Sequence, residues 1–114
     1  SIIMANVYKN IQAVINQAGS DVDMYTSPDA TTSVIKTIRL FNTHSGNLVV
    51  DIAVYDASST TTFEWDKVTV NLDSSENLLT YNNILILEAG DILRMQTPTT
   101  DVMKMTAAVL QISR

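Results

Sequence analysis

Apolar and polar residues alternate along much of this sequence with a period of two, which is typical of β-strands with one buried face. Residues 48–55 show the pattern best, because every second residue is aliphatic and the intervening set includes Asp51. We expect a strand here whose inner face is formed by Leu48, Val50, Ile52 and Val54.

Residues 84–95, ILILEAGDILRM, contain two apolar runs separated by a short polar interruption around Gly90. A helix would place Gly90 near its centre, at a cost of about 1 kcal/mol relative to alanine. It would also be apolar all round. A tight turn suits the glycine better, because glycine adopts positive φ without a steric penalty. The pattern therefore predicts two strands joined as a hairpin.

Other stretches repeat the pattern less clearly. Residues 33–42 carry apolar side chains on both faces, so their inner face stays open, and the polar loop 43–47 predicts antiparallel pairing with 48–55. Residues 61–71 place Phe63 and Trp65 on one face. Clusters of turn-forming residues predict turns at 56–60, 73–77 and 97–101.

The two ends of the chain also read as strands. From 102 to 113 the inner face is expected to hold Met103, Met105, Ala107 and Val109, and Leu110 with Ile112 indicates a bulge or a change of inner face. Residues 10–16 fit either a strand or an amphipathic helix, and their β-branched residues favour the strand.

About eight strands with polar turns and no long helical pattern predict an all-β fold, an antiparallel β-sandwich or jelly roll. At 114 residues the chain is expected to form a single domain. Residues 1–32 would supply an N-terminal arm and the first strands, and residues 33–114 the remainder of the same sandwich.

Charge and composition exclude several classes of function. The seven basic residues stand singly in a chain of net charge −5, which disfavours nucleic-acid binding because that binding needs clustered cations. No stretch approaches the roughly 20 apolar residues of a membrane span, so we expect no membrane partner. The chain has no cysteine, which excludes disulfides and thiolate metal sites.

Catalytic and metal-binding patterns are weak. His44 is the single histidine and falls in a polar loop, where a solvated turn residue is the expected role. Paired carboxylates at Asp21/Asp23 and Glu64/Asp66 are expected to share a solvent-facing side of a strand. Asp73 and Glu76 flank a serine turn that could offer oxygens to calcium, although turn chemistry alone explains both. We expect no enzyme, no cofactor and no metal.

Two binding hypotheses remain. Phe63 and Trp65 could form a platform for stacking a sugar ring, the alternative being that both fill the core. Ile2, Ile3 and Met4 form an apolar end before the first confident strand, and they would contact either a neighbouring subunit in an assembly or their own domain.

Three segments resemble the small all-β virion proteins of tailed double-stranded-DNA bacteriophages, the capsid decoration or cement type. They are residues 34–42 (VIKTIRLFN), 50–56 (VDIAVYD) and 85–94 (LILEAGDILR). The resemblance implies a non-enzymatic protein, made in the host cytoplasm, that binds the major capsid protein on the capsid exterior and stabilises the shell. It also implies self-association, frequently as a homotrimer.

Overall fold

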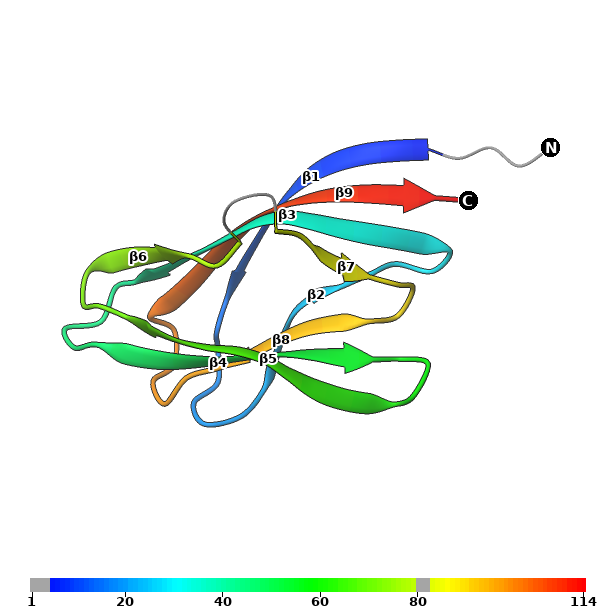
Figure 1. The fold of residues 1–114 in the computed structure, drawn as a ribbon. Helices are drawn as coiled ribbons and strands as arrows, with labels where there is room; N and C mark the ends of the chain where they lie inside the picture. The colour runs from blue at the N-terminus through cyan, green and yellow to red at the C-terminus, as the bar shows by residue number, and fades with distance from the viewer. Residues whose placement is uncertain (1–4, 80–82) are drawn as a thin grey trace.

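A computed structural model describes residues 5–79 and 83–114, which fold into two facing antiparallel sheets (Figure 1). Within these residues no helix is long and apolar enough to cross a bilayer. The strands are β1 (Ala5–Val14), β2 (Val22–Thr26), β3 (Thr31–Asn42), β4 (Leu48–Asp56), β5 (Thr61–Val70), β6 (Ser74–Asn77), β7 (Leu85–Leu87), β8 (Ile92–Gln96) and β9 (Met103–Ser113).

The strand order is that of a jelly roll. One sheet, here called sheet A, runs β1-β9-β3, and β6 and β7 pair with opposite ends of β3. The other, sheet B, runs β2-β8-β4-β5. The chain crosses from sheet to sheet at almost every connection, which is how eight-stranded jelly rolls are built. The predicted fold class is confirmed, with β6 and β7 sharing the place of one edge strand.

Two predicted pairings are wrong for the same reason. Strands β3 and β4 do not pair, because β3 lies in sheet A and β4 in sheet B. Strands β7 and β8 also lie in different sheets, so the turn at Gly90 (φ 84°) is a crossing between layers rather than the tip of a hairpin. Among the described strands, β4 and β5 are the consecutive pair that forms a hairpin.

A bulge explains why both faces of residues 33–42 looked apolar. The register of β3 against β9 shifts between Ile35 and Thr37, which leaves Lys36 as an extra residue. Side chains therefore point inward at Ile35 and, after the bulge, at Ile38. The irregularity predicted near Leu110 lies on β3, because β9 keeps a continuous register with β1.

The ends of the chain agree with their predictions more closely. Residues 5–14 form a strand, β1, and not a helix. The inner residues predicted for the last strand are all buried. The predicted turn at 73–77 is wrong, because residues 74–77 form β6 against the end of β3, and the turn lies before them at Asp73 (φ 48°).

The core lies between the two sheets and is formed by aliphatic and methionine side chains from both. Its fully buried members include Leu40, Val50, Ile52, Leu93, Met95, Met103 and Met105. Four of the five buried polar residues form hydrogen bonds through their side chains, whereas the buried Thr97 hydroxyl has no partner among the described residues. Asn42 is one of the four, and Ser27 and Ser33 pair through their hydroxyls, 2.8 Å apart.

Candidate interaction surfaces

The two sheets carry charges of opposite sign. The strands of sheet A contain four basic residues and one acidic residue, a net charge of +3. The strands of sheet B contain two basic and five acidic residues, a net charge of −3. Cations that stand singly in the sequence are thus brought onto one layer by the fold.

The outward face of sheet A holds three of these cations. Arg39 lies opposite Thr106 and Lys104 lies opposite Phe41, all exposed, because their strand neighbours point into the core. Lys36, at the bulge, completes the set. Arg39 donates to the Ser75 hydroxyl at 3.1 Å, and within the described residues none of the three forms an ion pair.

Beside the cations, four apolar residues cross the same face in one row, here called the apolar row. Cross-strand partners join Tyr8 to Leu110, Leu110 to Val34, and Val34 to Ile86. Tyr8 is 71% exposed and Ile86 is 53% exposed. The Lys36 ammonium lies 5.9 Å from the centre of the Tyr8 ring, within cation–π range. A contiguous apolar patch of this kind, bordered by cations, is typical of a protein contact surface.

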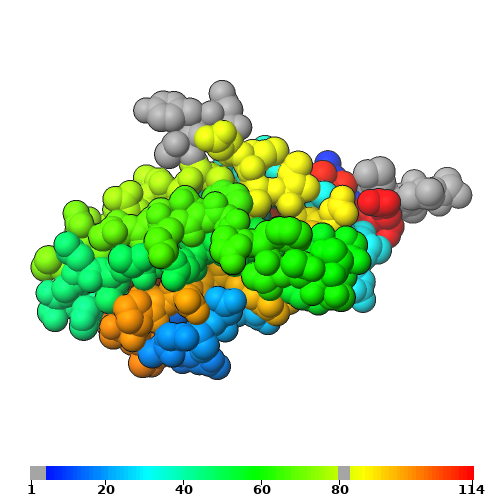
Figure 2. Space-filling model, turned by 60° about the horizontal axis from the view of Figure 1, so that its bottom comes forward, coloured from blue at the N-terminus to red at the C-terminus, as the bar shows by residue number. Residues whose placement is uncertain are grey.

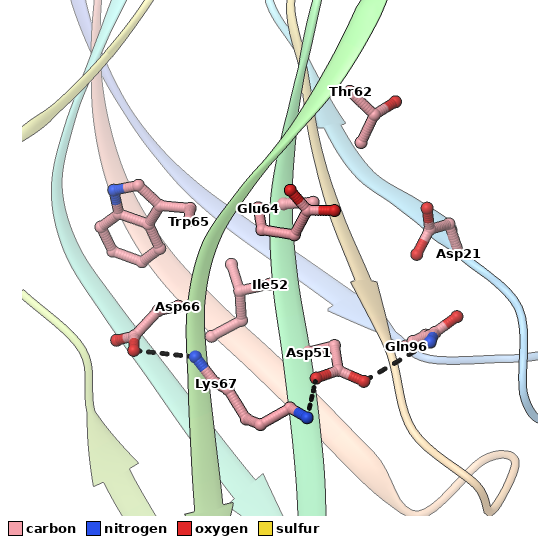
Figure 3. A pocket seen from close by; sticks show the side chains of 10 residues that line it. Asp21, Asp51, Ile52, Thr62, Glu64, Trp65, Asp66, Lys67 and Gln96 are labelled. Atoms are coloured by element: carbon pink, nitrogen blue, oxygen red, sulfur yellow. Dashed lines mark hydrogen bonds and ion pairs between the residues drawn. The ribbon is translucent and has the colours of Figure 1, made fainter.

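Sheet B presents a different surface. Figure 2 looks onto β4 and β5 (green), with the loops 15–21 (blue) and 97–102 (orange) beside them. A groove of about 540 Å³ lies here, and Figure 3 shows Asp51 between Lys67 and Gln96 along it. Lys67 pairs with Asp51 at 3.4 Å, and Arg94 pairs with Asp23 at 2.9 Å.

The ion pairs leave sheet B with little free cationic charge. Arg94 also lies over the Tyr55 ring, 4.6 Å from its centre. Among residues 5–79 and 83–114 no group of three or more metal-ligating side chains comes together, and that includes Asp73 and Glu76. The cation that lines the groove, Lys67, is therefore paired within the protein.

The structure places the members of the two predicted carboxylate pairs in different surroundings. Asp21 lines the groove, and Asp23 is held by Arg94. Glu64 and Asp66 were expected on the same side of β5, and this prediction is wrong. The pairing of β4 with β5 skips Trp65, so the side chains of Glu64 and Asp66 leave opposite sides of the strand (Figure 3), although both residues line the groove.

The two aromatic residues occupy different environments. Trp65 is half-buried, packs against the core and is one of the residues that line the groove. Phe63 is 54% exposed, so the core interpretation fits Trp65 and not Phe63. A sugar platform formed by both residues stays a prediction.

His44 and the apolar end are the remaining residues that the sequence analysis singled out. His44 lies in the loop after β3, half-buried, and its backbone N–H donates to Asn42. The Ser58 hydroxyl, and then that of Ser59, hydrogen-bonds the Asp56 carboxylate and lowers its pKa below the usual 3.8. Ile2, Ile3 and Met4 lie outside the described residues.

No family model matches the chain. No curated protein matches it either. The fold is similar to that of a chain in the cryo-EM structure of the giant freshwater prawn Macrobrachium rosenbergii extra small virus (XSV) VLP, with a TM-score of 0.58 and 11% identity. The match covers 100% of this chain and 82% of that chain. At this identity the likeness establishes a shared fold.

Proposed function

We propose that the protein is a non-enzymatic structural component of a virus particle. The observation that carries the proposal is the jelly-roll strand order, shared over the whole chain with a chain of a virus VLP. The resemblance of three segments to phage virion proteins supports the same role.

The outward face of sheet A is the surface that would contact the rest of the particle. Among the residues that the structure describes, Lys36, Arg39 and Lys104 have no acidic partner, and the apolar row lies beside them. A partner surface that is acidic and partly apolar would neutralise the cations and cover the row. Burying apolar side chains would supply the affinity, and the charges would fix the orientation.

The more specific proposal is a capsid decoration or cement protein, bound to the major capsid protein on the outside of the shell and made in the host cytoplasm. A net charge of −5 suits a position outside the shell better than one against packaged nucleic acid. With sheet A against the shell, the acidic and ion-paired sheet B would face solvent. The homotrimer implied by the resemblance stays a prediction.

Sedimentation with empty shells of the virus that encodes the chain tests this proposal. We expect the wild-type protein to sediment with the shells, and the double variant Arg39→Glu/Lys104→Glu to bind at least about tenfold more weakly, because both contact charges are reversed. The control Lys67→Glu also reverses a strand charge but lies on sheet B, so it should bind like wild type.

Three results would contradict the proposal. The first is absence of wild-type protein from the shell pellet. The second is equal loss of binding in the sheet A and sheet B variants, which would show that net charge matters and the face does not. The third is an absence of salt dependence, since a contact built on charge weakens as salt screens it.

A further inference from the structure

We propose that the free edge of β1 pairs antiparallel with β1 of a second copy, which would join two copies of sheet A into one continuous sheet. The inference deepens the proposed function and rests on it for its biological role, since subunits of a particle must contact one another. Its physical basis is the edge itself, independent of the particle.

Strand edges present unpaired N–H and C=O groups, and proteins usually protect them by shortness, bulges or charge. Three edges of this sandwich are protected. Strands β6 and β7 have four and three residues. Strand β2 has five residues and a register shift after Asp23. Strand β5 has the bulge at Trp65, and three charged residues surround it.

Strand β1 lacks these protections except for Lys9. It has ten residues and an unbroken register against β9. It contains no proline and no acidic residue. A long, regular and nearly uncharged edge of this kind is a template for another strand.

Hydrogen bonds at the start of β9 show which groups of β1 face outward. Ile15 N–H donates to Met103 C=O at 3.0 Å, and on the other side of β9 Thr43 N–H donates to Val102 C=O at 2.9 Å. Backbone groups alternate in direction along an antiparallel strand, so odd-numbered residues of β1 bond to β9. Even-numbered residues, from Asn6 to Val14, therefore direct their N–H and C=O to the free edge. No other described residue bonds to these groups.

The exposed half of β1 indicates where the two-fold axis between the paired strands would lie. Residues 5–10 are all exposed, and Tyr8 is the most exposed large apolar side chain of the described residues at 71%. A two-fold axis at Tyr8 would place Asn6 opposite Asn10 of the second copy, with about six backbone hydrogen bonds between the chains. Lys9 would then lie opposite Val7 of the second copy, so the two lysines would not face each other.

This contact produces a dimer. An antiparallel pair of identical strands is self-complementary, so it closes after two copies. It also extends the apolar row of one copy into that of the other, because Tyr8 stands at the β1 end of the row. A homotrimer would need a different contact.

Cysteine cross-linking tests the geometry directly, because the chain has no cysteine of its own. In the Tyr8→Cys variant, the Cα atoms of residue 8 in the two copies would lie about 5.5 Å apart, a separation that suits a disulfide between the two cysteines. Mild oxidation should give a covalent dimer. The control Thr69→Cys places the thiol on exposed β5 of sheet B and should give none.

Proline substitution isolates the backbone contribution. Asn10→Pro removes an N–H that points to the free edge and leaves the bonds between β1 and β9 in place. Asn10→Ala removes the same side chain and keeps the N–H. Sedimentation velocity of the full chain should show a dimer for the wild type and for Asn10→Ala. For Asn10→Pro the dissociation constant of the dimer should be at least about tenfold higher.

A wild-type monomer at about 100 µM, well above the dissociation constant of a specific dimer, would overturn the inference. Equal cross-linking of the Tyr8→Cys and Thr69→Cys variants would overturn it too, as would a trimer whose association Asn10→Pro leaves unchanged. Shell binding separates this inference from the proposed function. A dimer that fails to bind shells keeps the strand pairing and overturns the particle role, and a monomer that binds shells does the reverse.

Discussion

Asn42 offers the sharpest test of how the two sheets are held together. It lies at the end of β3 in sheet A and is fully buried. Its side-chain amide donates to Val70 C=O in β5 of sheet B, at 3.0 Å, and to Gly46 C=O at 3.0 Å. Its side-chain oxygen accepts from His44 N–H at 2.8 Å. One side chain thus links both sheets and the loop after β3.

The magnitude for Asn42→Ala follows from what each partner loses. Val70 is fully buried, so water could not replace the bond that its carbonyl loses, at about 1–3 kcal/mol. His44 and Gly46 are half-buried, and water can replace the lost bonds at roughly 0.5 kcal/mol each. We expect a loss of about 2–4 kcal/mol in unfolding free energy, or on the order of 10 °C in Tm.

Urea unfolding, followed by Trp65 fluorescence and circular dichroism, measures this loss. The control is Asn47→Ala, because Asn47 accepts one bond from Leu72 N–H at 2.9 Å and both residues are exposed. It should lose less than about 1 kcal/mol. Asn42→Asp should be at least as destabilised as Asn42→Ala, since it keeps the acceptor for His44 but loses both donors and buries a carboxylate against two carbonyl oxygens. If Asn42→Ala loses no more than the control, the buried bond to Val70 contributes nothing and the reasoning is refuted.

Four further predictions concern other parts of the chain. Gly90→Ala should cost about 1–2 kcal/mol by urea unfolding and exceed Gly19→Ala; both glycines have positive φ, but a Cβ at Gly90 would lie 3.1 Å from a neighbouring side-chain carbon. Because Asp56 has a lowered pKa, its contribution to stability should be present above the usual 3.8 and disappear as pH falls below it; Asp56→Asn should show a flatter urea midpoint between about pH 2 and 4. If a sugar platform exists, a glycan array should detect wild-type binding that Trp65→Ala loses, and no wild-type signal would reject the platform. If the apolar end is an assembly contact, deleting Ser1–Met4 should abolish attachment or association while the β-type circular dichroism persists; full retention of both would exclude that role.

Much of the architecture could be predicted from the sequence because the strand pattern depends on residues that are close together in the sequence. The alternation from Leu48 to Ile52 and from Met103 to Val109 identified buried faces that the structure confirms. The turn at Gly90 was also placed correctly, since glycine permits its positive φ. These features depend on neighbouring residues only, and the sequence displays them directly.

The candidate surface was not foreseen, because its members come from distant segments. Lys36 and Arg39 are about 65 residues from Lys104 in the sequence, yet β3 and β9 pair and place all three on one face. The apolar row joins residues from β1, β3, β7 and β9 in the same way. Register between distant strands, including the bulge at Lys36, decides which side chains become neighbours.

The amino-acid sequence by itself determined that the chain forms about eight strands, where most of them lie, and which side chains several of them bury. The tertiary structure alone decided which strands pair, that the turn at Gly90 crosses between sheets, and that cations gather on one sheet while β1 keeps a free edge. The physical reason is the distance along the sequence between the residues that interact. A period of two expresses the pleat of a single strand, whereas the sheet that a strand joins depends on packing both layers around one core.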